Sequence, residues 1–127
     1  FAPAGAWLAN KTPLENMGTP IADPVRIKIP AARRMRGGLK GTIIHIDHFG
    51  NLATNITRSQ LPDSTSTLHV RYKGIEITGL VHAFGEGQPG ELVALVDSSG
   101  FLSLCVVNDS AADRLKSRPG DPVEVRF

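Results

Sequence analysis

The chain has 127 residues, of which 41% are hydrophobic and 20% are charged, so its composition predicts one ordinary globular domain and argues against disorder. Its formal net charge is only +2, and no apolar run approaches the roughly 20 residues that span a bilayer. We therefore expect no membrane segment and a cytoplasmic location. Cys105 is the only cysteine, which excludes an intramolecular disulfide, and its apolar neighbours predict a small buried hydrophobe.

The first forty residues predict a tail and a connector. Residues 1–9 are apolar and helix-prone, with Pro3 at a position that a first helical turn tolerates. Four prolines between residues 10 and 40 remove backbone donors and discourage helix. We expect a long extended connector there, with one short strand at Val25–Ile29, and such connectors usually cross between domains or wrap one. Because the chain begins at Phe1 and not at Met, we interpret residues 1–40 as the end of a preceding domain and its linker.

From Gly41 onward the pattern is typical of strands. Thr42–Asp47 is rich in β-branched residues and alternates His45 and Asp47 against Ile44 and Ile46. The other expected strands are Leu52–Thr57, Thr67–Tyr72, Ile75–Val81, Leu92–Val96, Phe101–Val107 and Pro122–Phe127, with hairpin turns at Lys73-Gly74 and Asp97–Gly100.

One helix interrupts the strands. Ser110–Asp113 has the form of a capping box, with Asp in place of the usual Glu or Gln, and the helix should run to about Lys116. About seven strands with one short helix predict an all-β fold, and we expect a small antiparallel β-barrel over residues 41–127. A closed barrel is preferred to a sandwich because it leaves no exposed strand edges.

One basic group raises the alternative of a nucleic-acid-binding barrel. It comprises Arg33, Arg34, Arg36 and Lys40, next to two glycines. No aromatic residue lies among these side chains to stack on bases. We interpret the group as a solvated linker and expect no nucleic-acid partner, although salt-sensitive oligonucleotide binding would favour the alternative.

Metal and catalytic signatures are weak. His45 and Asp47 would share one strand face, but zinc normally takes three or four ligands. There is no Gly-x-Ser-x-Gly elbow and no recognisable Cys–His spacing. We therefore expect no metal, no cofactor and no catalytic residue within this chain.

The segment from Asp47 to Asn55, Asp-His-Phe-Gly-Asn-Leu-Ala-Thr-Asn, stands out. The segment has two interpretations. It is either a tight turn, since Gly50-Asn51 suits a hairpin, or a small binding loop. In the second reading Asn51 donates to and accepts from the edge of adenine, Phe49 covers the ring face, and Asp47 meets a cation.

This segment resembles the signature of the S-adenosylmethionine hydrolase and halogenase family. Weaker similarities follow in the family's order over nearly the whole chain, at residues 1–9, Pro13–Ile21, Asp97–Leu102, Ser110–Ala112 and Gly120–Val123. The resemblance implies a parent enzyme with an amino-terminal α/β domain followed by this barrel. It also implies a homotrimer in which the nucleoside lies between the large domain of one subunit and the barrel of its neighbour.

The resemblance also implies roles for eight residues. Asp47 matches a carboxylate that pairs with the methionine ammonium. Phe49 matches an aromatic residue beside the adenosyl group, and Asn51 matches an amide that hydrogen-bonds to adenine. Phe84 matches a second aromatic. The other implied contacts are those of Ser98 and Ser99 with the amino-acid part, and those of the backbone of Ser110 and Ala111, near a helix start, with the adenine edge.

The implied reaction is hydrolysis of S-adenosyl-L-methionine, the substrate, to adenosine and L-methionine. The family's residues that handle water precede Phe1, so this chain alone should be inactive. Chloride or fluoride as the nucleophile is an alternative, although halogenases place an arginine where this chain has Ser99. A non-catalytic adenosine-binding module is the alternative from another class.

Overall fold

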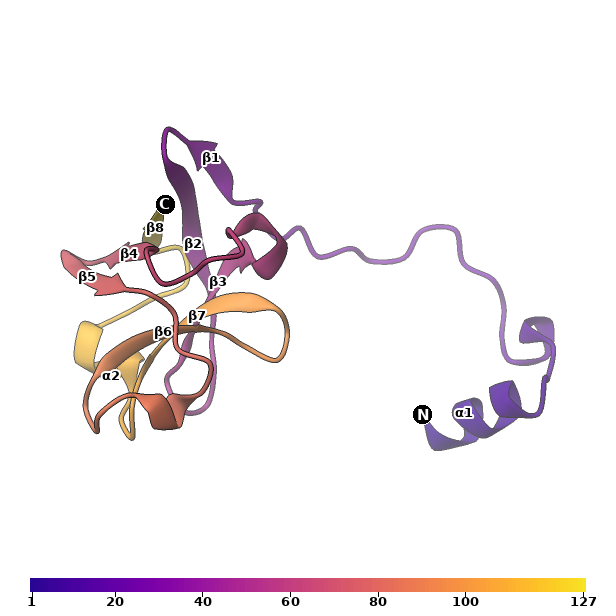
Figure 1. The fold of residues 1–127 in the computed structure, drawn as a ribbon. Coiled ribbons are helices and arrows are strands. Elements are labelled where there is room, and N and C mark those ends of the chain that lie inside the picture. Colours follow the sequence, from indigo (N-terminus) through magenta and orange to yellow (C-terminus); the bar gives the residue numbers. More distant parts are fainter.

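A computed structural model describes residues 1–127, the whole chain (Figure 1). In Figure 1 the first thirty residues extend away from a barrel formed by the rest. They contain helix α1 (Ala2–Ala9) and the short 3-10 helix η1 (Leu14–Asn16), neither of which has a buried residue. The expected helix at residues 1–9 is confirmed. None of the helices is long and apolar enough to cross a membrane.

The strand expected at Val25–Ile29 is wrong. The segment has no regular secondary structure, and Val25 and Ile27 are 99% and 88% exposed. Alternation of apolar and basic residues favours an extended chain, but a strand also needs a hydrogen-bonding partner, and no part of this chain lies against the segment.

The basic stretch is not a linker, contrary to our interpretation. Strand β1 (Arg33–Met35) pairs antiparallel with the start of β2 (Gly38–Ile46), so Arg33 lies opposite Lys40. The connector is attached to the barrel just before this hairpin: the Asn55 side chain accepts from the Thr42 N–H at 2.8 Å and donates to the Pro30 carbonyl at 2.6 Å.

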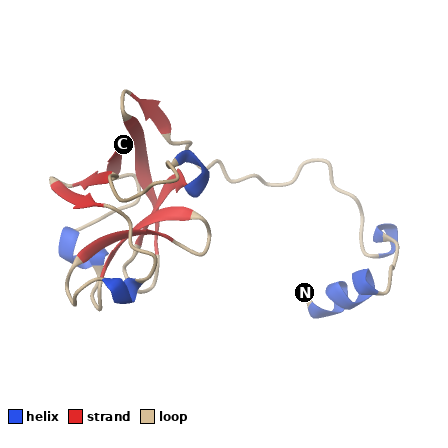
Figure 2. Cartoon of the chain, in the orientation of Figure 1, coloured by secondary structure: helices blue, strands red, loops and turns tan.

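The remaining elements complete an antiparallel sheet, as Figure 2 shows in red. They are β3 (Leu52–Thr57), β4 (His69–Tyr72), β5 (Ile75–Thr78), β6 (Leu92–Val96), β7 (Phe101–Val106) and β8 (Pro122–Arg126), with 3-10 helices η2 (Arg58–Gln60) and η3 (Phe84–Glu86) and helix α2 (Ala111–Leu115).

The sheet runs in the order β5-β4-β8-β2-β3-β7-β6. Just after β5, the Val81 N–H donates to the Ala94 carbonyl of β6 at 2.9 Å and bridges the two ends of this order. The expected small antiparallel barrel of about seven strands is therefore confirmed, in a nearly closed form. The expected short helix is confirmed as well, since Ser110 Oγ accepts from the Asp113 N–H at 3.1 Å at the start of α2.

Alternate residues of β6 and β7 face opposite ways. Ala94, Leu102 and Leu104 are buried in the main core with the largest buried side chain, Tyr72. Val93, Leu95, Cys105 and Val107 form a second apolar cluster against Val81. Because side chains of a strand alternate between faces, this second cluster lies on the outer face of the barrel, beneath the segment that follows β5.

Helix α2 is attached to the β4–β5 hairpin by a polar network. The Tyr72 hydroxyl donates to Asp121 Oδ2 at 2.9 Å, and Lys73 Nζ lies 2.9 Å from the same oxygen. Lys73 Nζ also donates to the carbonyls of Leu115 and Lys116 at the end of α2. A cation at the carboxyl end of a helix satisfies carbonyls that lack intrahelical partners, so this network holds α2 beside the sheet.

Candidate functional site

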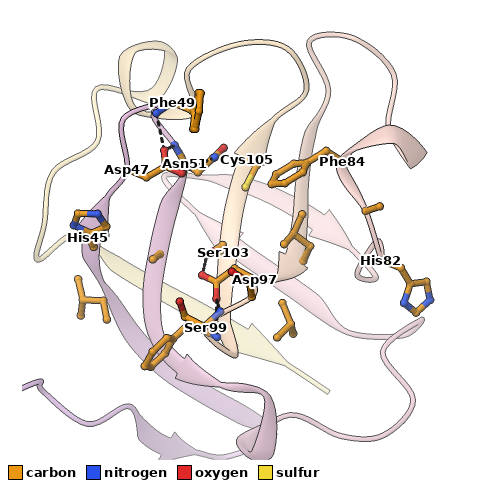
Figure 3. A pocket seen from close by; sticks show the side chains of 17 residues that line it. His45, Asp47, Phe49, Asn51, His82, Phe84, Asp97, Ser99, Ser103 and Cys105 are labelled. Atoms are coloured by element: carbon orange, nitrogen blue, oxygen red, sulfur yellow. Dashed lines mark hydrogen bonds between the residues drawn. The ribbon is translucent and has the colours of Figure 1, made fainter. Parts of the chain in front are cut away.

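A cavity of about 730 Å³ lies on the outer face of the sheet. Ser103 and Cys105 of β7 form its floor, and His82 and Phe84 stand at its side (Figure 3). Ala53 of β3 and Ala83 also line it. The turns after β2 and β6 complete the lining. This volume suits a small organic ligand, and concave sites of mixed apolar and polar lining are the usual binding sites of proteins.

The turn after β2 is held by Asp47. Its Oδ1 accepts from the N–H groups of Phe49 and Asn51, both at 2.9 Å. Its Oδ2 accepts from the side-chain amide of Asn51 at 2.8 Å, as the upper dashed lines of Figure 3 show. Partial burial acts to raise the pKa of Asp47, but the hydrogen bonds from Asn51, Phe49 and Gly50 outweigh it and lower the pKa below its ordinary value.

Asn51 keeps part of its hydrogen-bonding capacity. A side-chain amide has two N–H donors and one carbonyl acceptor, and the Asp47 contact uses one donor. The second N–H and Oδ1 remain, which is the donor and acceptor pair that an adenine edge requires. The tight-turn reading and the binding-loop reading of this segment are thus compatible: the same residues form the turn and line the cavity.

The turn after β6 is held in the same way by Asp97. Its Oδ1 accepts from the N–H groups of Ser99 and Phe101 at 2.8 and 3.1 Å, and its Oδ2 accepts from Ser103 Oγ at 2.7 Å. Ser98 and Ser99 line the cavity and are exposed. Asp97 was not among the predicted site residues, although Asp97-Ser-Ser-Gly100 repeats the Asp-x-x-Gly form of Asp47–Gly50, a signal that could have identified it.

Two exposed aromatic side chains stand at the cavity. Phe49 is 75% exposed and Phe84 is 48% exposed. With Asn51 they also line a second hollow of about 480 Å³, whose lining includes Ser110. Exposed aromatic rings that gather in a concave site indicate ligand binding more strongly than scattered surface leucines do, because a ligand that covers the rings removes their apolar area from water.

The structure therefore brings together most of the predicted site residues. Asp47, Phe49, Asn51, Phe84, Ser98 and Ser99 line the larger cavity, and Ser110 lines the adjoining one. Ala111 lines neither and is fully buried in the core, so its side chain is not available to a ligand.

Simple alternation along β2 assigned Ile44 to the wrong face of the strand. A β-bulge between Ile43 and His45 interrupts the pairing of β2 with β3. As a result Ile43 is buried, and both Ile44 and His45 line the cavity. A bulge adds one residue to one strand of a pair and shifts the side chains beyond it, which simple alternation cannot anticipate.

Cys105 and the histidines do not suggest other chemistry. Burial, followed by the nearby charges of Asp47 and Asp97, raises the pKa of the Cys105 thiol to about 12, so a reactive thiolate is disfavoured. No group of three or more His, Cys, Asp or Glu side chains is placed to hold a metal ion. The arrangement offers hydrogen-bonding groups, aromatic faces and carboxylates to a ligand.

The barrel is nearly closed and carries on its outer face a cavity lined by aromatic, hydroxyl and carboxylate side chains. These features are those of the β-barrels that bind small ligands. Within that class, the chain belongs to the family described as SAM hydroxide adenosyltransferase C-terminal domain, whose family model matches residues 41–124. The family resemblance noted in the sequence is thereby confirmed.

Named relatives agree with this assignment. The chain is 36% identical over 129 residues to the "(R)-S-adenosyl-L-methionine hydrolase" of Salinispora tropica, covering 98% of this chain and 48% of the relative. A protein of the same name from Thermus thermophilus is 30% identical over 125 residues, covering 98% of this chain and 46% of the relative. The chain thus spans about half the length of these curated relatives.

Solved structures share the fold. The crystal structure of an uncharacterized conserved protein from Thermotoga maritima superimposes with a TM-score of 0.74 at 28% identity, covering all of this chain and 50% of the other. That of a conserved hypothetical protein from Thermus thermophilus has a TM-score of 0.65 at 30% identity, covering 98% and 50%.

Proposed function

We propose that this chain is the adenosyl-binding domain of an enzyme that hydrolyses S-adenosyl-L-methionine to adenosine and L-methionine. Family membership and the names of the relatives support the substrate class. The single observation that carries the proposal for this chain is the convergence of Phe49, Asn51 and Phe84, which line both hollows of the outer face.

The chemistry of the substrate fits the lining. Adenine requires an apolar slot with a donor and an acceptor at its rim, for which Phe49 and the free capacity of Asn51 are suited. Asp47 would meet the ammonium of the methionine part from one end of the cavity, and the exposed Ser98 and Ser99 would contact the amino-acid part from the other end. Ser110 and the Ala111 backbone at the start of α2 would meet the adenine edge.

In the proposed reaction water attacks the ribose 5′ carbon in line, and methionine leaves with the sulfur and its electron pair. Sulfonium is already a good leaving group, so orientation and exclusion of water account for much of the rate. This chain would hold the nucleoside and the methionine part in place. The groups that handle water would come from an amino-terminal domain, and residues 1–40 would connect to it.

The proposal includes the assembly and its location. The parent enzyme would be a homotrimer in the cytoplasm, with the barrel of one subunit facing the large domain of its neighbour. The exposed apolar side chains of the first thirty residues, among them Trp7, Val25 and Ile27, are compatible with a partner surface. Sedimentation equilibrium of the full-length protein would test the trimer.

The deciding experiment uses the full-length protein that contains this chain. It is incubated with S-adenosylmethionine, with and without chloride or fluoride, and the nucleosides are separated by chromatography. We expect adenosine under all conditions. A halide-dependent 5′-halogenated nucleoside would replace the hydrolase by a halogenase, and the absence of both products would favour a non-catalytic adenosine-binding module.

A further inference from the structure

Two equivalent turns face the cavity from opposite ends of the β3–β7 pair. In each turn the Asp N–H donates to the carbonyl four residues later, at 3.1 Å for Asp47 and 2.9 Å for Asp97. In each, the N–H of the glycine three residues later donates back to the Asp carbonyl. Because β3 and β7 run antiparallel, the two carboxylates lie at the two ends of one cavity, and both line it.

The two carboxylates are held alike and keep the same free capacity. Each accepts three hydrogen bonds from its own surroundings, two at Oδ1 and one at Oδ2. An ionised carboxylate offers about four acceptor positions, so each Oδ2 retains about one for a ligand. Such turns restrain the side chains, and an oriented charge costs little reorganisation when a ligand arrives.

No lysine or arginine of this chain compensates these charges within the cavity, whose lining includes two histidines, His45 and His82. The field of both carboxylates reaches the floor, because Asp47 and Asp97 add to the burial that raises the pKa of Cys105. Phe49 and Phe84 stand in the same cavity, and aromatic faces attract ligand cations.

We infer that Asp97 is a specificity-determining residue, which together with Asp47 makes this cavity prefer a positively charged adenosyl ligand over a neutral one of the same shape. The inference rests on the proposed function, because it concerns the sulfonium charge of the same substrate. It goes further by assigning charge selection to a residue in the turn that carries Ser98 and Ser99. It also predicts weaker retention of adenosine, the neutral product.

The test measures a ratio of dissociation constants for two unreactive ligands in the full-length protein. S-adenosylhomocysteine has a neutral thioether, and sinefungin has a protonated amine at the corresponding position. Both constants are measured by isothermal titration calorimetry for the wild type, Asp97→Asn and Asp97→Ser. Asn and Ser side chains can still accept from the turn N–H groups, so both variants remove the charge while the turn is retained.

We expect each Asp97 variant to reduce the preference for sinefungin about 3- to 10-fold, a range typical of one partly solvated charge pair. Asp63→Asn makes the same change of net charge at a fully exposed side chain outside the cavity and should leave the ratio unchanged. An unchanged ratio in folded Asp97→Asn and Asp97→Ser would overturn the inference.

Hydrolysis of S-adenosylmethionine by the same wild-type preparation separates the two claims. If the wild type hydrolyses the substrate while the Asp97 variants keep the full preference, only the charge-selection inference fails. If the wild type neither hydrolyses the substrate nor binds either analogue, the proposed function fails, and the inference fails with it.

Discussion

The Asn51 side-chain amide donates to Asp47 Oδ2 over 2.8 Å, and so the residue proposed to read adenine also fixes the carboxylate proposed to meet the ammonium. The two roles are coupled through one hydrogen bond. A substitution at either position should therefore affect both the affinity for the ligand and the conformation of the turn.

Asn51→Ala in the full-length enzyme should lower kcat/KM for S-adenosylmethionine about 10- to 100-fold. The reason is that a polar ligand edge loses its partner in a site built to bind it. Steady-state kinetics provide the measurement. Gln88→Ala, which removes an exposed amide outside both hollows, is the matched control and should have little effect. Unchanged kcat and KM for Asn51→Ala would show that the site is assigned wrongly.

Phe49→Ala should weaken ligand binding without destabilising the barrel. The ring is 75% exposed, so its removal leaves no core cavity, whereas aromatic stacking on a base is worth about 1–3 kcal/mol. We expect KM to rise about 10-fold or more and the melting temperature to stay near that of the wild type. His48→Ala serves as control, since His48 touches the Phe49 ring edge-on but does not line the cavity. An equal effect of both variants would contradict the role of Phe49.

Gly50→Ala should destabilise the protein more than Gly100→Ala. Both glycines have positive φ, +84° and +80°, where a side chain costs about 1 kcal/mol. A Cβ at Gly50 would also lie 2.1 Å from Ser110 Oγ, the cap of α2, whereas nothing lies within 4 Å at Gly100. We expect about 1–3 kcal/mol of additional loss for Gly50→Ala, measured by denaturant unfolding. Equal losses would mean that the turn and α2 are not in contact.

Acid should remove the stabilising effect of Asp47. Its pKa is lowered in the folded state, so the carboxylate stabilises the fold above the unfolded pKa of about 3.9 and loses this effect as pH falls through the folded pKa. Asp47→Asn should be less stable than the wild type at pH 7, and the difference should shrink below about pH 4. Unfolding midpoints between pH 7 and pH 2 measure it, with Asp63→Asn as control. A difference that does not vary with pH would refute this explanation.

Much of the barrel was predictable because its signals are local. β-branched runs and Gly-containing turns predicted β3, β6 and β7 almost to the residue, and the capping residue Ser110 predicted α2. The segment around Asn51 stood out by its side-chain types, which left a tight turn and a binding loop both open, and only the family resemblance implied a binding role for it. The hairpin of β1 was missed because its charged residues carry no apolar alternation, and pairing with β2 decides its conformation.

What the sequence by itself determined is most strands of the barrel, the short helix, and the turns at Asp47–Gly50 and Asp97–Gly100, since these depend on neighbouring residues and their backbone preferences. Only the tertiary structure decided which face of the sheet carries the cavity. The bulge in β2 brings Ile44 to it beside His45, and the segment after β5 brings Phe84 to it across the sheet. It also decided that Asp97 shares one site with Asp47, because that depends on the antiparallel pairing of two hairpins far apart in the chain.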